Sequence, residues 1–135
     1  MSQESIRKAL ESRLKALTPT FPTAYENDKF KPTNGTDYQE CALLPANPDN
    51  AVMGSGFYQE LGVFQVVLKY RLGIGSKDIQ TRAEAIRTHF KRGTTMLQDG
   101  ITVIVKNTPA IASGFRDGDR WCVPVSISYQ ADINL

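Results

Sequence analysis

FYQELGVFQVVLKYRL, residues 57–72, is the longest segment of the chain with an alternating apolar pattern. From position 64 onward, one face of this segment is apolar or aromatic: Phe64, Val66, Leu68, Tyr70 and Leu72. The opposite face is mixed: Leu61, Val63, Gln65, Val67, Lys69 and Arg71. A period of two predicts a β-strand, and a middle that is apolar on both faces is typical of a central strand.

The length of this segment predicts that part of it leaves the core. Sixteen residues at about 3.3 Å each would span roughly 50 Å, far more than a usual strand. A single domain of this chain length is only about 30–35 Å across. One end should therefore project past the core or bend sharply, and a projecting strand has free edges that favour pairing with another chain.

Helices are predicted on both sides of this strand. Residues 3–17 form the first, because Ile6, Leu10, Leu14 and Leu17 recur at helical spacing. Ser2 is its expected N-cap, and Thr18-Pro19 ends it. The second helix follows Gly73-Ile74-Gly75 with Ser76 as the expected N-cap and Gly93 as the C′ residue. Its apolar residues also share one face: Ile79, Ala83, Ile86 and Phe90.

Five further strands are expected, at residues 24–27, 38–44, 101–106, 110–116 and 119–131. The last has the cleanest alternation, and Pro124 within it indicates an edge strand or a bulge. The order is then α-β-β-β-α-β-β-β. This order predicts one α+β domain, residues 1–135, with a mostly antiparallel sheet of about five to six strands and two helices packed on it.

Composition excludes several classes of protein. Sixteen basic and 14 acidic residues give a net charge of +2, too small for a dedicated binder of nucleic acid or membrane surfaces. No apolar run approaches the roughly 20 residues that cross a bilayer, and the first residues lack the apolar region of a signal peptide. Cys41 and Cys122 are expected as reduced thiols in a cytosolic protein.

No group of residues predicts catalysis or a cofactor. His89 is the only histidine, so a zinc site or a serine–histidine pair has too few members, and a surface position is expected for it. Residues 73–77 combine glycines, a helix start and Lys77, which suits anion binding, but lack the spacing of a phosphate-binding loop. Residues 117–119 are expected as a hairpin turn rather than a calcium site.

Two further features each allow two interpretations. The basic residues of the second helix are expected on a solvated face, although a ring of such domains could bring them to passing DNA: Arg82, Arg87, Lys91 and Arg92. Trp121 is expected to pack in the core, with an interface anchor as the alternative.

Several segments follow one another in a recognisable order. They begin with IRKAL at residues 6–10, PTAYEN at 22–27 and Leu44-Pro45. They continue with GVFQV at 62–66, Gly73-Ile74-Gly75 and AEAI at 83–86, and end with Phe90 and DRWCVPV at 119–125. In this order of segments the chain resembles the phage tail-terminator-like proteins, similar to the lambda-type minor tail protein.

The resemblance implies a homohexameric ring in the virion tail, assembled in the host cytoplasm. Such a ring caps the growing tail tube, stops its polymerisation and offers a surface to the head-completion protein. The implied partners are other copies of the chain, the tail-tube protein and the head-completion or connector protein. DNA is only passing cargo, and neither catalysis nor a cofactor is implied.

The residues expected at interfaces follow from exposure and free strand edges rather than from the resemblance. They lie in the long loop, at the strand ends and at the hairpin tip: Asn47, Asp49, Met53, Phe57, Tyr58, Lys69, Arg71, Phe115 and Arg116. Two alternatives stay open. One is another head–tail connector or tail-tube subunit, and the other is a small anion-binding module at residues 75–77.

Overall fold

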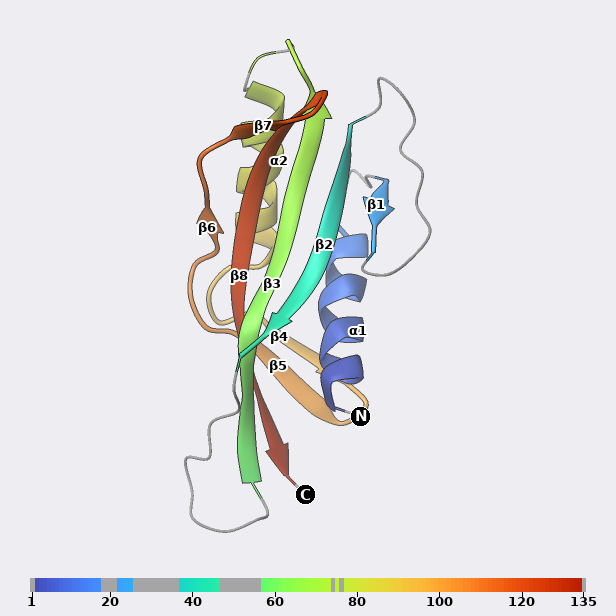
Figure 1. Ribbon diagram of the computed structural model, residues 1–135. Helices are drawn as coiled ribbons and strands as arrows, with labels where there is room; N and C mark the ends of the chain where they lie inside the picture. Colours follow the sequence, from blue (N-terminus) through green and yellow to red (C-terminus); the bar gives the residue numbers. More distant parts are fainter. Residues whose placement is uncertain are drawn as a thin grey trace.

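A computed structural model describes residues 2–17, 22–25, 37–46, 57–73, 75 and 77–134. Within these ranges, two helices and eight strands follow one another (Figure 1). Their bounds are α1 Ser2–Lys15, β1 Thr23–Ala24, β2 Tyr38–Pro45, β3 Phe57–Arg71, α2 Lys77–His89, β4 Thr95–Gln98, β5 Ile101–Val105, β6 Ala110–Ile111, β7 Phe115–Asp117 and β8 Arg120–Asn134.

The predicted α+β class, with a mostly antiparallel sheet and two helices, is confirmed. The strands run in the order β1-β2-β3-β8-β5-β4, and β6 and β7 also pair with β8. Among the described strands, only β1 and β2 pair in parallel. The sheet is built on β3 and β8, which pair antiparallel along their whole length from Phe57↔Asn134 to Arg71↔Arg120.

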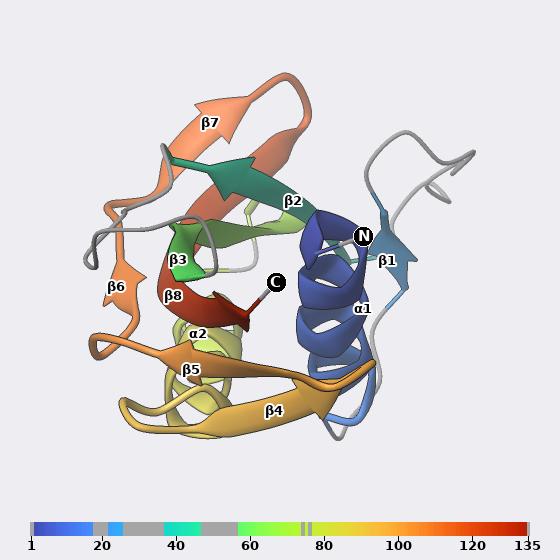
Figure 2. The same cartoon turned by 90° about the horizontal axis from the view of Figure 1, so that it is seen from below.

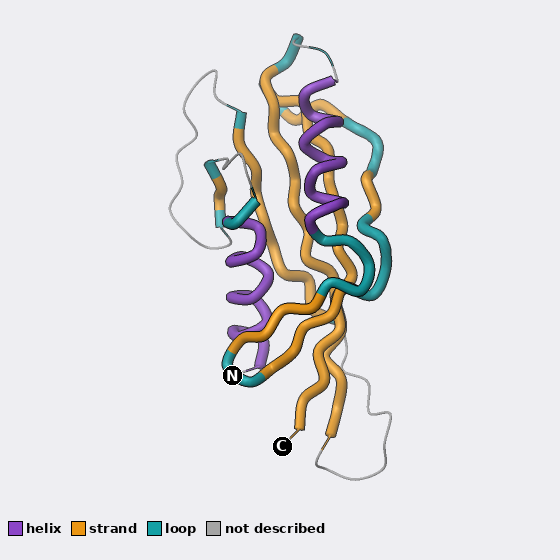
Figure 3. Tube along the Cα trace, turned by 180° about the vertical axis from the view of Figure 1, so that it is seen from behind, coloured by secondary structure: helices purple, strands orange, loops and turns teal. Residues whose placement is uncertain are grey.

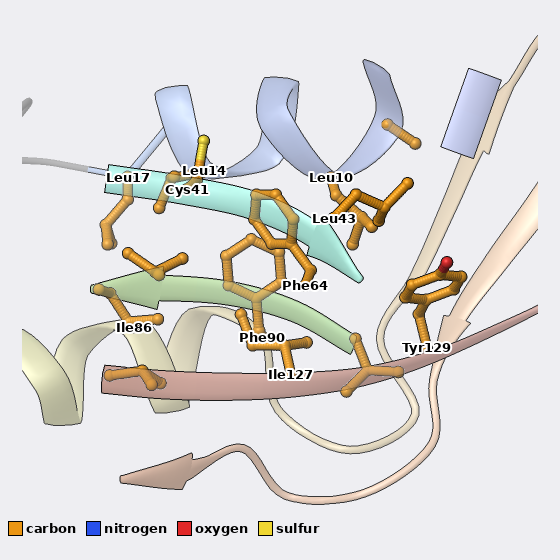
Figure 4. Close-up of a cluster of buried hydrophobic side chains, with 14 of the residues drawn as sticks. Leu10, Leu14, Leu17, Cys41, Leu43, Phe64, Ile86, Phe90, Ile127 and Tyr129 are labelled. Carbon is orange, nitrogen blue, oxygen red and sulfur yellow. The ribbon is translucent and has the colours of Figure 1, made fainter. Parts of the chain in front are cut away.

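Both helices pack on the same face of the sheet. Seen from below, the sheet curls so that α1 fills the space between β2 and β4, while α2 lies against β3 and β8 (Figure 2). The side chains of both helices meet those of the central strands in one apolar core (Figure 4). Phe64 of β3 packs near Phe90 at the end of α2, with ring centroids 6.3 Å apart.

β8 is a central strand, so the expectation of an edge or a bulge at Pro124 was wrong. The outer side of β8 is covered in turn by β7, β6 and β5. The carbonyl of Pro124 accepts a hydrogen bond from the amide of Ala112. In an antiparallel strand the N–H and C=O of a residue point to the same side, so the missing N–H of Pro124 faces the gap between β6 and β7.

The strands differ from the prediction in two places. The strand expected at 110–116 is split into β6 and β7, because Gly114 lies against the indole of Trp121 and the chain there follows the ring. β4 was not anticipated. A two-residue turn joins it to β5, with φ of 52° at Asp99 and 78° at Gly100, the geometry of a hairpin turn with both residues left-handed.

α2 ends earlier than expected. Its last residue is His89, and Gly93, with a φ of 87°, lies in a separate turn instead of capping the helix. The amide of Thr94 closes that turn on the carbonyl of Lys91. Ser76, the expected N-cap, lies outside the described residues, and Ser2 is the first helical residue rather than the cap.

The ends of β3 and β8 extend beyond the rest of the sheet, as the length of the segment predicted. β2 pairs with β3 only as far as Gly62, and β5 pairs with β8 only as far as Ala131. Residues 57–60 of β3 and 131–134 of β8 therefore continue as a two-stranded extension, which we call the ribbon (Figures 1 and 3). Beyond those limits neither edge of the ribbon has a neighbouring strand among the described residues.

Candidate assembly surfaces

The ribbon has one covered face and one open face. On the helix side, Glu60 and Ile133 are buried and Tyr58 packs against the core. On the other side, Gln59 lies opposite Asp132 and donates a hydrogen bond of 3.1 Å from its Nε2 to the Asp132 carboxylate. The free backbone edges and the polar face are thus the parts of the ribbon that another chain can reach.

Two buried polar atoms lie close to the point where the ribbon leaves the core. The Oε2 atom of Glu60 and the hydroxyl of Tyr129 are buried, and neither has a hydrogen-bond partner among the described residues. Burial, followed by the negative charge of Glu60, raises the pKa of Tyr129 to about 12, while the charge of Arg7 acts in the opposite direction. Groups of this kind destabilise the isolated chain.

Gly62 allows β2, β3 and β8 to lie close together at this point. A Cβ atom on Gly62 would lie 2.6 Å from the carbonyl oxygen of Leu44 and 2.6 Å from the hydroxyl of Tyr129. The ring of Tyr129 therefore occupies the space that a side chain would need.

The opposite end of the sheet carries a cluster of charges on its helix-free face. The Nζ atom of Lys69 lies 3.2 Å from a carboxylate oxygen of Glu40 and 3.7 Å from one of Asp117. Burial lowers the pKa of Lys69, but its hydrogen bond to Glu40 and the charge of that carboxylate outweigh burial, so the pKa is raised. Lys69 thus links β2, β3 and β7.

Two more cations lie at this end. The backbone amide and the Nε of Arg71 both donate to one carboxylate oxygen of Asp37, at 3.0 and 3.3 Å. The guanidinium of Arg120 lies over the ring of Tyr38, 5.0 Å from its centroid. Each cation therefore has a partner within the chain, which leaves the side chains in defined positions for a docking partner.

A pocket of about 320 Å³ opens beside this cluster. Its lining is mostly apolar and consists of Arg71, Leu72, Gly73, Gly75 and Trp121. Trp121 is partly buried. It packs against the core, as expected, and the rest of its surface remains accessible. The glycine segment considered for anion binding does border a pocket, and Trp121 is part of the same wall.

The residues expected at interfaces fall into two groups. Lys69, Arg71, Phe115 and Arg116 come together at the charged end of the sheet, because β3, β8 and β7 are adjacent there. Phe115 is 46% exposed, and Arg116 is exposed and donates from its Nε to the carbonyl of Gly118.

The remaining expected residues lie at the other end or outside the described part. Tyr58 belongs to the ribbon, and the backbone of Phe57 pairs there with Asn134. Asn47, Asp49 and Met53 lie outside the described residues. Glu60 and Asp132 were missed by the sequence analysis, although acidic residues without basic neighbours near the ends of both long strands were visible in the sequence.

Arg82 corrects the expectation of a fully solvated basic face on α2. It is buried, and its Nη2 donates to the Oε1 of Gln39, which is itself buried and donates to Thr23. The side chain therefore bridges α2 to the β1–β2 edge. Lys91 and Arg92, by contrast, are exposed as expected.

His89 is half-buried rather than on the surface. Its Nε2 donates a hydrogen bond of 2.6 Å to the carbonyl of Arg13, and the Nε of Arg13 donates to the carbonyl of His89 at 2.9 Å. This reciprocal pair joins the C-terminal ends of α1 and α2. The only histidine thus has a structural role.

Other kinds of site were also considered. Within the described ranges, no three or more histidine, cysteine or acidic side chains are grouped as a metal site would require. In the same part of the chain, neither helix combines the length and apolar character of a membrane span. Cys41 and Cys122 are buried and do not form a disulfide.

Comparison with known proteins agrees with a role in assembly. A family model described as phage tail terminator protein matches residues 5–129. No curated protein matches the chain. One solved structure, of a protein whose name is only a sequence identifier, is 30% identical, with a TM-score of 0.78 and coverage of 97% of this chain and 96% of that one. The chain therefore belongs to the phage tail terminator family and is a phage tail assembly protein.

Proposed function

We propose that this protein caps the tail tube of a phage or prophage as an oligomeric ring, most simply a hexamer. The ring ends tail polymerisation and provides the surface to which the head joins. The observation that carries the proposal is the ribbon, whose edges have no neighbouring strand within the described part of a chain that belongs to the tail terminator family.

The proposed mechanism is surface matching. Copies associate head to tail. They form a closed ring when the rotation that relates each copy to the next adds up to a full turn. One face of the ring fits the last layer of the tail-tube protein, and the other face cannot accept a further layer but binds the head-completion or connector protein. Tail components are the partners, DNA passes through the ring as cargo, and the protein acts in the virion tail after assembly in the host cytoplasm.

The protein is proposed to act without catalysis. Its charged groups at the sheet end are already paired with one another, as Lys69 is with Glu40 and Asp117. Such pairs hold these side chains in place. The role of this end is then recognition of a neighbouring protein.

Electron microscopy and light scattering of the purified protein test the proposal. We expect closed rings of uniform mass, and we expect added protein to shorten or terminate tubes that assemble from the tail-tube protein. Long stacks formed by this chain alone would instead identify a tail-tube subunit. Tyr58→Ala and Arg116→Ala should reduce ring formation or alter tail length, and unchanged assembly in both variants would contradict the assigned surfaces.

The pocket at Trp121 favours a second candidate, a small-ligand or anion-binding function. Its wall includes Arg71 and the backbone of Gly73 and Gly75, close to the start of α2. Titration calorimetry with phosphate and with ATP distinguishes the candidates. Saturable heat that Arg71→Ala abolishes would support this second function, and its absence would leave the assembly role.

A further inference from the structure

The ribbon carries only negative charge. Residues 57–60 and 131–134 contain Glu60 and Asp132 and no basic residue. Asp132 is exposed, and its carboxylate accepts hydrogen bonds from Gln59 at 3.1 Å and Gln130 at 3.4 Å. Both donors are neutral amides, so they orient the carboxylate without neutralising it.

Glu60 is the second acidic side chain of the ribbon and lies on its helix side. The side chain is 5% exposed, and its Oε2 has no hydrogen-bond partner among the described residues. The charge of a buried carboxylate is screened by solvent less than that of an exposed one. A cation that docks on the open face of the ribbon would contact Asp132, and the charge of Glu60 on the opposite face would add attraction at longer range.

A matching positive surface lies elsewhere on the chain. Residues 85–98 and 101–109 contain four basic residues and no acidic residue. Three of the four are exposed, and we call them the basic turn: Lys91, Arg92 and Lys106. Hydrogen bonds of 2.9 Å join Gly93 to Val105 and Val105 to Thr94, which hold the two segments side by side.

The basic turn adjoins a free strand edge. Thr94 leads directly into β4, which ends the sheet and pairs only with β5 among the described strands. Leu97 of β4 is 73% exposed. This surface thus offers positive charge, unpaired backbone groups and an apolar side chain, which complement the negative charge and free edges of the ribbon.

Within one molecule the two surfaces are apart. The ribbon extends below the core, whereas the loop between α2 and β4 lies at the level of the core (Figure 3). A contact between them requires a second copy. Because the two surfaces are different, such a contact is head-to-tail and can propagate around a ring.

We propose that the ribbon of one copy docks on the basic turn and the free edge of β4 of a second copy. This inference rests on the proposed ring and names its contact. Asp132 would face Arg92 and its neighbours, and backbone pairing along β4 would add strength. Electrostatic complementarity of this kind chiefly selects the partner and speeds association.

Charge reversal tests the contact. Asp132→Lys and Arg92→Glu should each raise the concentration needed for half-assembly by about tenfold or more, and the double variant should return it to within about threefold of wild type. Sedimentation velocity measures the assembly, and circular dichroism checks folding. Glu84→Lys and Lys8→Glu, exposed charges on the two helices that belong to neither surface, are matched controls. Asp132→Asn, which keeps the acceptor oxygen and removes the charge, should show a smaller effect in the same direction.

The outcomes distinguish failure of this contact from failure of the proposed function. Rings that form equally well with Asp132→Lys, Asp132→Asn and Arg92→Glu overturn the contact and leave the ring intact. Single defects that the double variant does not rescue also overturn it. A wild type that stays monomeric and does not cap tubes overturns both. If Arg92→Glu weakens binding to DNA without changing the assembled mass, the basic turn is a DNA surface and the contact is wrong.

Discussion

At position 62 the sheet has room for a hydrogen atom but not for a methyl group. We expect Gly62→Ala to lower the free energy of unfolding by about 1–3 kcal/mol, because the new Cβ would overlap the Leu44 carbonyl and the Tyr129 hydroxyl. Urea denaturation measures the change. Ser128→Ala, on the helix-free face, is the control and should change stability by less than about 0.5 kcal/mol. Equal free energies of unfolding for the two variants would show that the strands can move apart to fit the methyl group without losing stability.

The hydroxyl of Tyr129 predicts a dependence on alkaline pH. The pKa of this residue is about 12 in the folded chain, above the ordinary value of 10.0, so folding favours its neutral form. The stabilisation is complete below pH 10 and is lost as the pH rises towards 12.

Tyr129→Phe removes both this titration and a buried hydroxyl without a partner. Near neutral pH we expect the variant to be as stable as wild type or more stable by about 1 kcal/mol. Its advantage should grow between pH 10 and 12 by at most about 2–3 kcal/mol. Chemical denaturation at pH 8 and pH 11 measures the two differences. A difference that does not change with pH would contradict the shifted pKa.

At the scale of the elements, the two helices are joined by Arg13 and His89. Arg13→Ala removes a hydrogen bond to the His89 carbonyl and the contact of the guanidinium with the Phe90 ring, 5.9 Å from its centroid. We expect stability to fall by about 1.5–2 kcal/mol. Thermal unfolding measures the loss. Lys15→Ala, an exposed change in the same turn of α1, is the control, and a similar loss in both variants would argue against the helix–helix contact.

For the whole molecule, opposite charges on the ribbon and the basic turn predict that salt weakens assembly. Raising the ionic strength from about 0.1 M to about 1 M shortens the screening length from about 10 Å to about 3 Å. The ring should then require a higher protein concentration to form. Light scattering over a dilution series at both salt concentrations measures the change. Assembly that is stronger at high salt would indicate an apolar contact instead.

Much of the architecture was predictable from local patterns. The alternation in residues 57–72 and 119–131 located the two long strands, and the spacing of Ile6, Leu10 and Leu14 located α1. The length of β3 even predicted the projecting end. β4 was missed because Thr95–Gln98 is short and its stability depends on pairing with β5 and on packing against α1, which are contacts with distant segments. Gly93 was misplaced because a positive φ suits a turn as well as a helix cap.

The sequence alone determined the class of fold, the order of its elements and the absence of a recognisable reaction motif, since hydrophobic periodicity and side-chain chemistry are local properties. Only the tertiary structure decided which residues meet. It buried Arg82 against Gln39, made His89 a link between helices and turned Pro124 toward a gap beside a central strand. It also left Glu60 and Asp132 in a ribbon without cations. These outcomes depend on strand register and packing between distant segments, which no local pattern specifies.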